Sequence, residues 1–189
     1  SNCNMDWEST IKNELRKIAK GKTVLDVGGY NGEQAKVSLD AGAISAICVD
    51  DGSWVTYDWP KPEKRGGVVF IDGNFNDYNK PADIVIFQNV IYHQRNPWKA
   101  MEQIRRLTKE VLILATSIVA GKEPMWRIYK PYEGHFKSWT VAWRPTVSGM
   151  LKLLEATGFS NSEILGQDEG SIAIKSYPGE LPIGFGERT

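Results

Sequence analysis

The residues with the clearest chemical meaning lie between positions 24 and 32, which read Val-Leu-Asp-Val-Gly-Gly-Tyr-Asn-Gly. Glycine lets a backbone approach a ligand closely and adopt conformations that a Cβ atom would block. A short apolar run precedes the glycines and a helix-compatible segment follows them, so the turn is expected to join a buried strand to a helix. The candidate ligand-binding residues of this turn are Asp26, Gly28, Gly29, Tyr30 and Gly32.

Asp50 is the expected acidic partner of this turn. It ends a second apolar run, residues 44–49, and lies 24 residues after Asp26. A carboxylate at such a strand end accepts hydrogen bonds from both hydroxyls of a ribose, as an acidic residue does about 20 residues after the glycines of dinucleotide sites. Asp51 follows directly and is assigned to the same site.

The spacing of the glycines indicates which nucleotide is bound. A dinucleotide site reads G-x-G-x-x-G and holds a pyrophosphate, whereas this turn reads G-G-Y-N-G with Asp26 two residues before it. A carboxylate suits the amino group of an aminoacyl sulfonium better than a pyrophosphate. The turn therefore predicts S-adenosyl-L-methionine in preference to NAD, and the alternative is a tight strand-to-helix turn without a ligand.

Two further pairs of residues follow predicted strands and are assigned to the cofactor. Asn74 and Phe75 follow the third strand, where the amide could bond an adenine edge and the ring could pack on it. The alternative for this pair is an Asx-turn beside a core phenylalanine. Gln88 and Asn89 follow the fourth strand.

The candidate catalytic residues, Tyr92 and His93, also follow the fourth strand. Methyl transfer is an in-line displacement in which the protein supplies position and, for a hydroxyl acceptor, a base. Histidine suits that role near neutral pH. The alternative is that His93 is only a hydrogen-bonded corner between strand and helix. Arg95, two residues on, is assigned to the substrate.

Residues 117–144 are predicted to be an irregular substrate lid. They mix aromatic and basic side chains, which suits a planar or anionic acceptor, and irregular segments of this length are often functional. Trp139, Trp143 and Arg144 are the candidate substrate contacts, with Arg144 the candidate for an anion. The alternative is a solvated loop with its aromatic rings in the core. No metal site is expected.

The elements that position these residues alternate between short apolar strands and helices. Alternation of this kind predicts βαβ units and right-handed crossovers. The expected fold is a doubly wound, mostly parallel seven-stranded α/β sheet with helices on both faces and a C-terminal antiparallel strand pair, in one domain over residues 1–189. Helices are expected at 6–20, 32–41, 97–107 and 146–156, and strands at 23–27, 44–49, 68–71, 84–87, 111–115, 164–165 and 171–174.

The composition indicates which partners and which cellular location to expect. The formal net charge is zero, which does not favour nucleic acid or an anionic membrane as a partner. Cys3 and Cys48 form no disulfide or metal-binding pattern, so a reducing cytoplasmic location is expected. Ser1 to Trp7 lack a basic start followed by an apolar stretch, so no signal peptide is expected, and no apolar run approaches the ~20 residues that span a bilayer. Oligomeric state is left open.

Four segments together resemble class I S-adenosylmethionine-dependent methyltransferases. Residues 24–32 resemble their motif I, and residues 50–54 (D-D-G-S-W) resemble the acidic strand end of one subgroup. Residues 89–97 (N-V-I-Y-H-Q-R-N-P) resemble the V-L-Y-H-x-R-x-P signature of that subgroup. Residues 138–159, with W-R-P-T at 143–146 and A-T-G-F at 156–159, resemble its W-x-R-P-T…A-G-F segment. The subgroup is similar to the tRNA wobble-uridine carboxymethyltransferases that make 5-oxyacetyl uridine.

The resemblance implies a Rossmann-like fold and methyl transfer to an oxygen or nitrogen atom. The tRNA enzymes carry an N-terminal extension, whereas about 20 residues precede the first strand here, so a small-molecule acceptor is expected. Two alternatives remain: a tRNA-modifying methyl- or carboxymethyltransferase, and a non-catalytic binding module that keeps the fold, which Tyr30 leaves open because the wider superfamily has glycine at that position.

Overall fold

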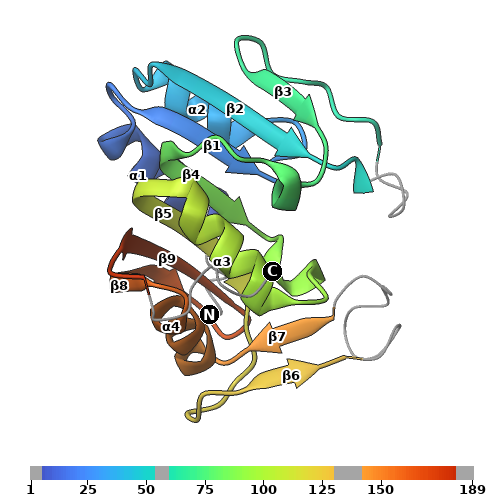
Figure 1. Ribbon diagram of the computed structural model, residues 1–189, viewed down its shortest axis with the longest axis vertical. Helices are drawn as coiled ribbons and strands as arrows, with labels where there is room; N and C mark the ends of the chain where they lie inside the picture. The colour runs from blue at the N-terminus through green and yellow to red at the C-terminus, as the bar shows by residue number, and fades with distance from the viewer. Residues whose placement is uncertain (1–5, 54–59, 130–141, 182–189) are drawn as a thin grey trace.

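A seven-stranded sheet with the order β3-β2-β1-β4-β5-β9-β8 forms the centre of the molecule (Figure 1). The computed structural model describes residues 6–53, 60–129 and 142–181. Strands β1 to β5 are parallel, and β9 runs antiparallel to both of its neighbours. The strands are β1 (Thr23–Val27), β2 (Ser45–Asp50), β3 (Val69–Asp72), β4 (Ala82–Gln88), β5 (Thr108–Ser117), β8 (Phe159–Gln167) and β9 (Ser171–Pro178). The predicted sheet is confirmed.

Helices cover both faces of this sheet. Helices α1 (Trp7–Ile18) and α2 (Glu33–Asp40) pack on one face, and α3 (Pro97–Leu107) and α4 (Val147–Ala156) pack on the other. Because neighbouring strand residues point to opposite faces, Val24 joins the core under α1 and α2, whereas Leu25 joins the core under α3 and α4. The central strands are therefore apolar on both faces, which is why they read as continuous apolar runs.

Local sequence explains where the helices begin. Asp6 caps α1 through the amide of Ser9, and Asn96 caps α3 ahead of Pro97. Thr146 caps α4 through the amide of Gly149. Helix α2 instead begins after Gly32, whose φ of 73° is left-handed and favours glycine.

The chain order places a topological switch between β1 and β4. After β1 the chain builds β2 and β3 on one side, and then returns so that β4 pairs with the other edge of β1. In open α/β sheets a ligand binds outside the carboxyl ends of the strands at such a point. The glycine turn after β1 and the segment after β4 flank it.

The prediction that residues 117–144 are irregular is wrong in two places. Strands β6 (Trp126–Ile128) and β7 (Trp143–Pro145) form a separate antiparallel ribbon. Each strand is three residues long, which is too short for an alternation pattern to show in the sequence. The amide of Ala142 donates to the carbonyl of Tyr92 at 2.8 Å, so the ribbon is joined to the segment after β4. No helix of the described residues is long and apolar enough to cross a membrane.

Candidate functional site

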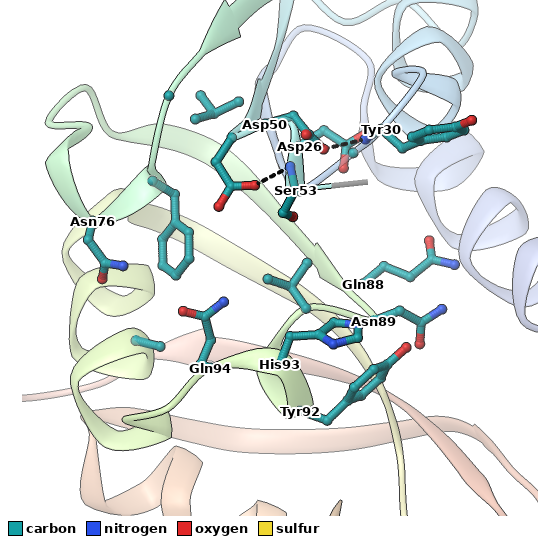
Figure 2. Close-up of a pocket in the computed structure, with 18 of the residues that line it drawn as sticks. Asp26, Tyr30, Asp50, Ser53, Asn76, Gln88, Asn89, Tyr92, His93 and Gln94 are labelled. Carbon is teal, nitrogen blue, oxygen red and sulfur yellow. Dashed lines mark hydrogen bonds between the residues drawn. The ribbon is translucent and has the colours of Figure 1, made fainter. Parts of the chain in front are cut away.

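A cavity of about 820 Å³ opens at the carboxyl ends of β1, β2 and β4. Its walls come from the glycine turn, the end of β2, the 3-10 turn η2 (Phe75–Asp77), and the segment from the end of β4 to the start of α3. Figure 2 shows Asp50 and Tyr30 on one side of the cavity, with Tyr92, His93 and Gln94 opposite them. Residues far apart in the sequence therefore face one space.

Close packing explains the glycines of the turn. A Cβ atom on Gly28 would lie 2.5 Å from Cγ2 of Val90, and the φ of Gly28 is +67°. A Cβ atom on Gly29 would lie 2.5 Å from the carboxylate of Asp26. Gly32 does not line the cavity, and a Cβ atom there would meet the ring of Phe70 at 2.7 Å. Gly32 therefore serves the geometry of the turn, while Gly28 and Gly29 form a cavity wall.

Asp26 presents a buried carboxylate to the cavity. It is 2% exposed and accepts one hydrogen bond, at 3.3 Å, from the amide of Ala35. Burial raises the pKa of Asp26 to about 7; the bond from Ala35 lowers it and the charge of Asp50 adds to the rise. Within the described part of the chain no cation pairs with Asp26, so a positively charged ligand group would compensate its charge.

Asp50 links the end of β2 to the glycine turn. Its Oδ2 accepts from the amide of Tyr30 at 3.0 Å, and its Oδ1 accepts from the amide of Gly52 at 2.8 Å. These bonds hold the carboxylate against the cavity, and each oxygen keeps a further lone pair for a ribose hydroxyl. Asp51 is exposed and accepts from the amide of Ser53 at 2.9 Å. Both aspartates line the cavity.

Tyr30 adopts a left-handed φ of 52°. Its hydroxyl donates to the carbonyl of Pro60, and in Figure 2 its ring points away from Tyr92 and His93. The ring therefore connects the glycine turn to the chain before β3, while the residue still lines the cavity.

The prediction that Asn74 contacts the cofactor is wrong. Its side chain accepts from the amide of Asn76 at 2.9 Å, which is an Asx-turn, and Asn74 does not line the cavity. Asn76 lines it instead, and Figure 2 shows its carboxamide on the same side of the cavity as that of Gln94. Phe75 lines the cavity but also packs on Phe87, with ring centroids 5.5 Å apart.

The segment after β4 carries the predicted catalytic pair. Tyr92 and His93 lie in the 3-10 turn η3 (Ile91–His93), with ring centroids 4.3 Å apart, and both line the cavity. Gln88 and Asn89 line it as well, and Asn89 has a left-handed φ of 57°. The structure thus brings these four residues to the same space as Asp26 and Asp50.

Of the predicted substrate contacts, some line the cavity and others lie elsewhere in the fold. Arg95 lines the cavity. Trp143 and Arg144 do not; Nη2 of Arg144 donates to the carbonyl of Gly170 at 3.2 Å, so the side chain ties the ribbon to the turn between β8 and β9. Trp139 lies outside the described residues. The cavity residues that sequence reasoning did not assign include four with polar side chains, because nothing in their spacing marks them: Gln34, Asn76, Gln94 and Lys99.

These residues fit S-adenosylmethionine. Glycines allow close approach, Asp50 can accept from a ribose, and Asp26 is an uncompensated carboxylate for a cationic ligand. Among the described residues, no group of three or more His, Cys, Asp or Glu side chains is placed to hold a metal ion.

Comparisons with known proteins agree with this geometry. A model of the methyltransferase domain family matches residues 5–164. A tRNA U34 carboxymethyltransferase of Helicobacter pylori (strain G27) is 28% identical over 173 residues, covering 85% of this chain and 66% of that protein. The chain thus spans slightly less than two thirds of that relative.

Solved structures show the same fold. The 1,6-didemethyltoxoflavin-N1-methyltransferase of Burkholderia thailandensis, with bound S-adenosylhomocysteine, matches with a TM-score of 0.62 at 16% identity, over 90% of this chain and 79% of that chain. Human N-acetylserotonin methyltransferase in complex with SAM matches with a TM-score of 0.63 at 16% identity, over 91% and 51%. The chain belongs to the methyltransferase domain family.

Proposed function

We propose that this chain transfers a methyl group from S-adenosylmethionine to an oxygen or nitrogen atom of a small-molecule acceptor. The observation that carries the proposal is that Tyr92 and His93 face the same cavity as Asp26 and Asp50. When bound, the cofactor supplies an electrophilic methyl group on a sulfonium. The cofactor-binding side and the candidate acceptor side therefore meet in one cavity.

His93 is the proposed base. In an in-line transfer the acceptor atom approaches from the side opposite the leaving sulfur, and positioning contributes much of the rate. His93 would take the proton that a hydroxyl or amine acceptor loses, with Tyr92 packed against it and Arg95 available to an acceptor anion. The ribbon joined to Tyr92 through Ala142 supports a role for the described ends of residues 117–144 in covering the acceptor.

Incubation with radiolabelled S-adenosylmethionine and fractionated small metabolites tests the proposal. Label should pass to a small molecule, and His93→Gln should slow transfer about 100-fold or more while S-adenosylhomocysteine binds as before. Cofactor binding without turnover on any acceptor pool would contradict the proposal and favour a non-catalytic module.

A tRNA-modifying role is the second candidate, and similarity to the tRNA U34 carboxymethyltransferase of Helicobacter pylori supports it. A gel shift with bulk tRNA at low salt should show a complex that weakens as salt rises if this candidate is right. Mass spectrometry of the treated tRNA then distinguishes methyl from carboxymethyl transfer. We also propose a reducing, cytoplasmic setting, which the buried free thiol of Cys48 supports.

A further inference from the structure

Gln34 presents an unsatisfied acceptor at the topological switch. It lies in the first turn of α2, is 8% exposed and lines the cavity. Its Nε2 donates to Oε1 of Gln88, at the end of β4, over 3.1 Å. Its own Oε1 is buried and has no hydrogen-bond partner among the described residues. A buried polar atom left without a partner destabilises the cofactor-free protein, so this oxygen is suited to a ligand that donates a hydrogen bond.

The surroundings of Gln34 indicate the charge of that donor. Asp26 accepts from the amide of Ala35, the residue after Gln34, so the carboxylate and the carboxamide adjoin the same turn of α2. Asp26 is buried, lines the cavity and has no cationic partner among the described residues. A neutral acceptor beside an uncompensated carboxylate favours an ammonium over a neutral amide or hydroxyl.

The Gln88 bond fixes the direction of this acceptor. Because the Nε2 of Gln34, on α2, is held by Gln88, at the end of β4, the oxygen of the same carboxamide is the atom left for the ligand. Asp50, the expected ribose contact, lies at the end of β2, on the other side of β1 from β4. This arrangement separates a ribose position at β2 from an amino-group position at β4 and α2.

We infer that Oε1 of Gln34, oriented by Gln88, accepts a hydrogen bond from the α-ammonium of the cofactor and so selects for its amino-acid end. Gln34 is thus a cofactor-binding residue, and Gln88 is a positioning residue that acts through it. The inference concerns cofactor recognition and does not depend on which acceptor is methylated.

Calorimetry with two ligands tests the inference without an activity assay. The ligands are S-adenosylhomocysteine and its deaminated analogue, in which hydrogen replaces the α-amino group. Gln34→Leu should bind S-adenosylhomocysteine about 10-fold or more weakly, as expected for losing a hydrogen bond to a charged group. It should bind the deaminated analogue as the wild type does. Gln167→Leu, at an exposed position of β8, is the matched control and should change neither affinity.

Two further variants address folding and orientation. Gln34→Glu keeps the shape and the acceptor but loses the Nε2 donor to Gln88, so it should bind S-adenosylhomocysteine more tightly than Gln34→Leu does. Gln88→Leu should weaken that binding by a smaller factor, because Gln34 remains but loses its orientation. Far-UV circular dichroism should show the same fold for each variant.

Three results would overturn the inference: unchanged affinity of Gln34→Leu for S-adenosylhomocysteine, equal loss of both ligands in that variant, or binding by Gln34→Glu that is no tighter than binding by Gln34→Leu. Failure of the wild type to bind either ligand would instead contradict the cofactor assignment itself. The two failures are therefore distinguishable.

Discussion

The carboxylate of Asp50 accepts a hydrogen bond from the backbone amide of Tyr30 at 3.0 Å, which joins the end of β2 to the glycine turn after β1. Two elements that lie 20 residues apart in the sequence thus share one cavity wall. The same carboxylate has a role in the shape of the turn and a second role as the expected ribose contact.

Replacing Asp50 by alanine should remove both roles. We expect Asp50→Ala to weaken S-adenosylhomocysteine binding about 10- to 100-fold, since bonds to a charged group are stronger than neutral ones. Asp51→Ala is the matched control: Asp51 is exposed and its carboxylate accepts from the nearby amide of Ser53, so its loss should cost about threefold or less. Titration calorimetry measures both, and equal losses in the two variants would contradict the assignment of Asp50 to the ribose.

A Cβ atom on Gly28 should destabilise the protein through contact as well as through backbone strain. Gly28 and Gly21 both have positive φ, +67° and +73°, but only Gly28 has a neighbour, Val90, within overlap distance. Gly28→Ala should therefore lower the free energy of unfolding by about 1–3 kcal/mol more than Gly21→Ala does. Urea denaturation of both variants measures the difference. Equal losses would show that strain alone accounts for the effect.

Asp26 should make the cofactor-free protein less stable as pH rises. The folded state keeps the proton of Asp26 up to about pH 7, whereas the unfolded chain loses it near 3.8. Because the folded pKa is raised, the folded state binds more protons between these values, and stability falls as pH increases from about 4 to 7. Asp26→Asn lacks this dependence and should be about 2–4 kcal/mol more stable than the wild type at pH 8.

Denaturation curves of the wild type and the asparagine variant at several pH values test this prediction. The difference between the two free energies of unfolding should grow across that window and level off above it. A constant difference at all pH values would show that Asp26 is not buried as an uncompensated acid.

Cofactor binding should release a proton from Asp26. A nearby ammonium stabilises the carboxylate and lowers its pKa from about 7. At pH 6 the wild type should therefore release up to about one proton on binding S-adenosylhomocysteine, and its affinity should increase with pH until about 7. Calorimetry in two buffers of different ionisation enthalpy counts the protons. Asp26→Asn should bind more weakly and release none, and equal release by both proteins would contradict a contact with Asp26.

Much of the fold could be predicted because each central strand is apolar on both faces and the helices have local start signals. Pro97 marks the first residue of α3, and the predicted limits of that helix and of β1 agree with the structure. The ribbon of β6 and β7 could not be predicted, because three-residue strands carry no periodic pattern. Arg144 was assigned to the substrate from its motif, but its position in the ribbon directs it to Gly170.

The sequence by itself determined the residues at the strand ends: Asp26, Asp50 and the glycines are recognisable because their types and spacing follow from local strand and turn geometry. Only the tertiary structure decided which of the neighbouring side chains reach the cavity. Asn76 lines it and Asn74 does not, because a 3-10 turn rotates one carboxamide inward and uses the other as a cap. Gln34 and Gln88 meet because the chain returns to set β4 beside β1. The two glutamines are 54 residues apart, and no local pattern in the sequence encodes their contact.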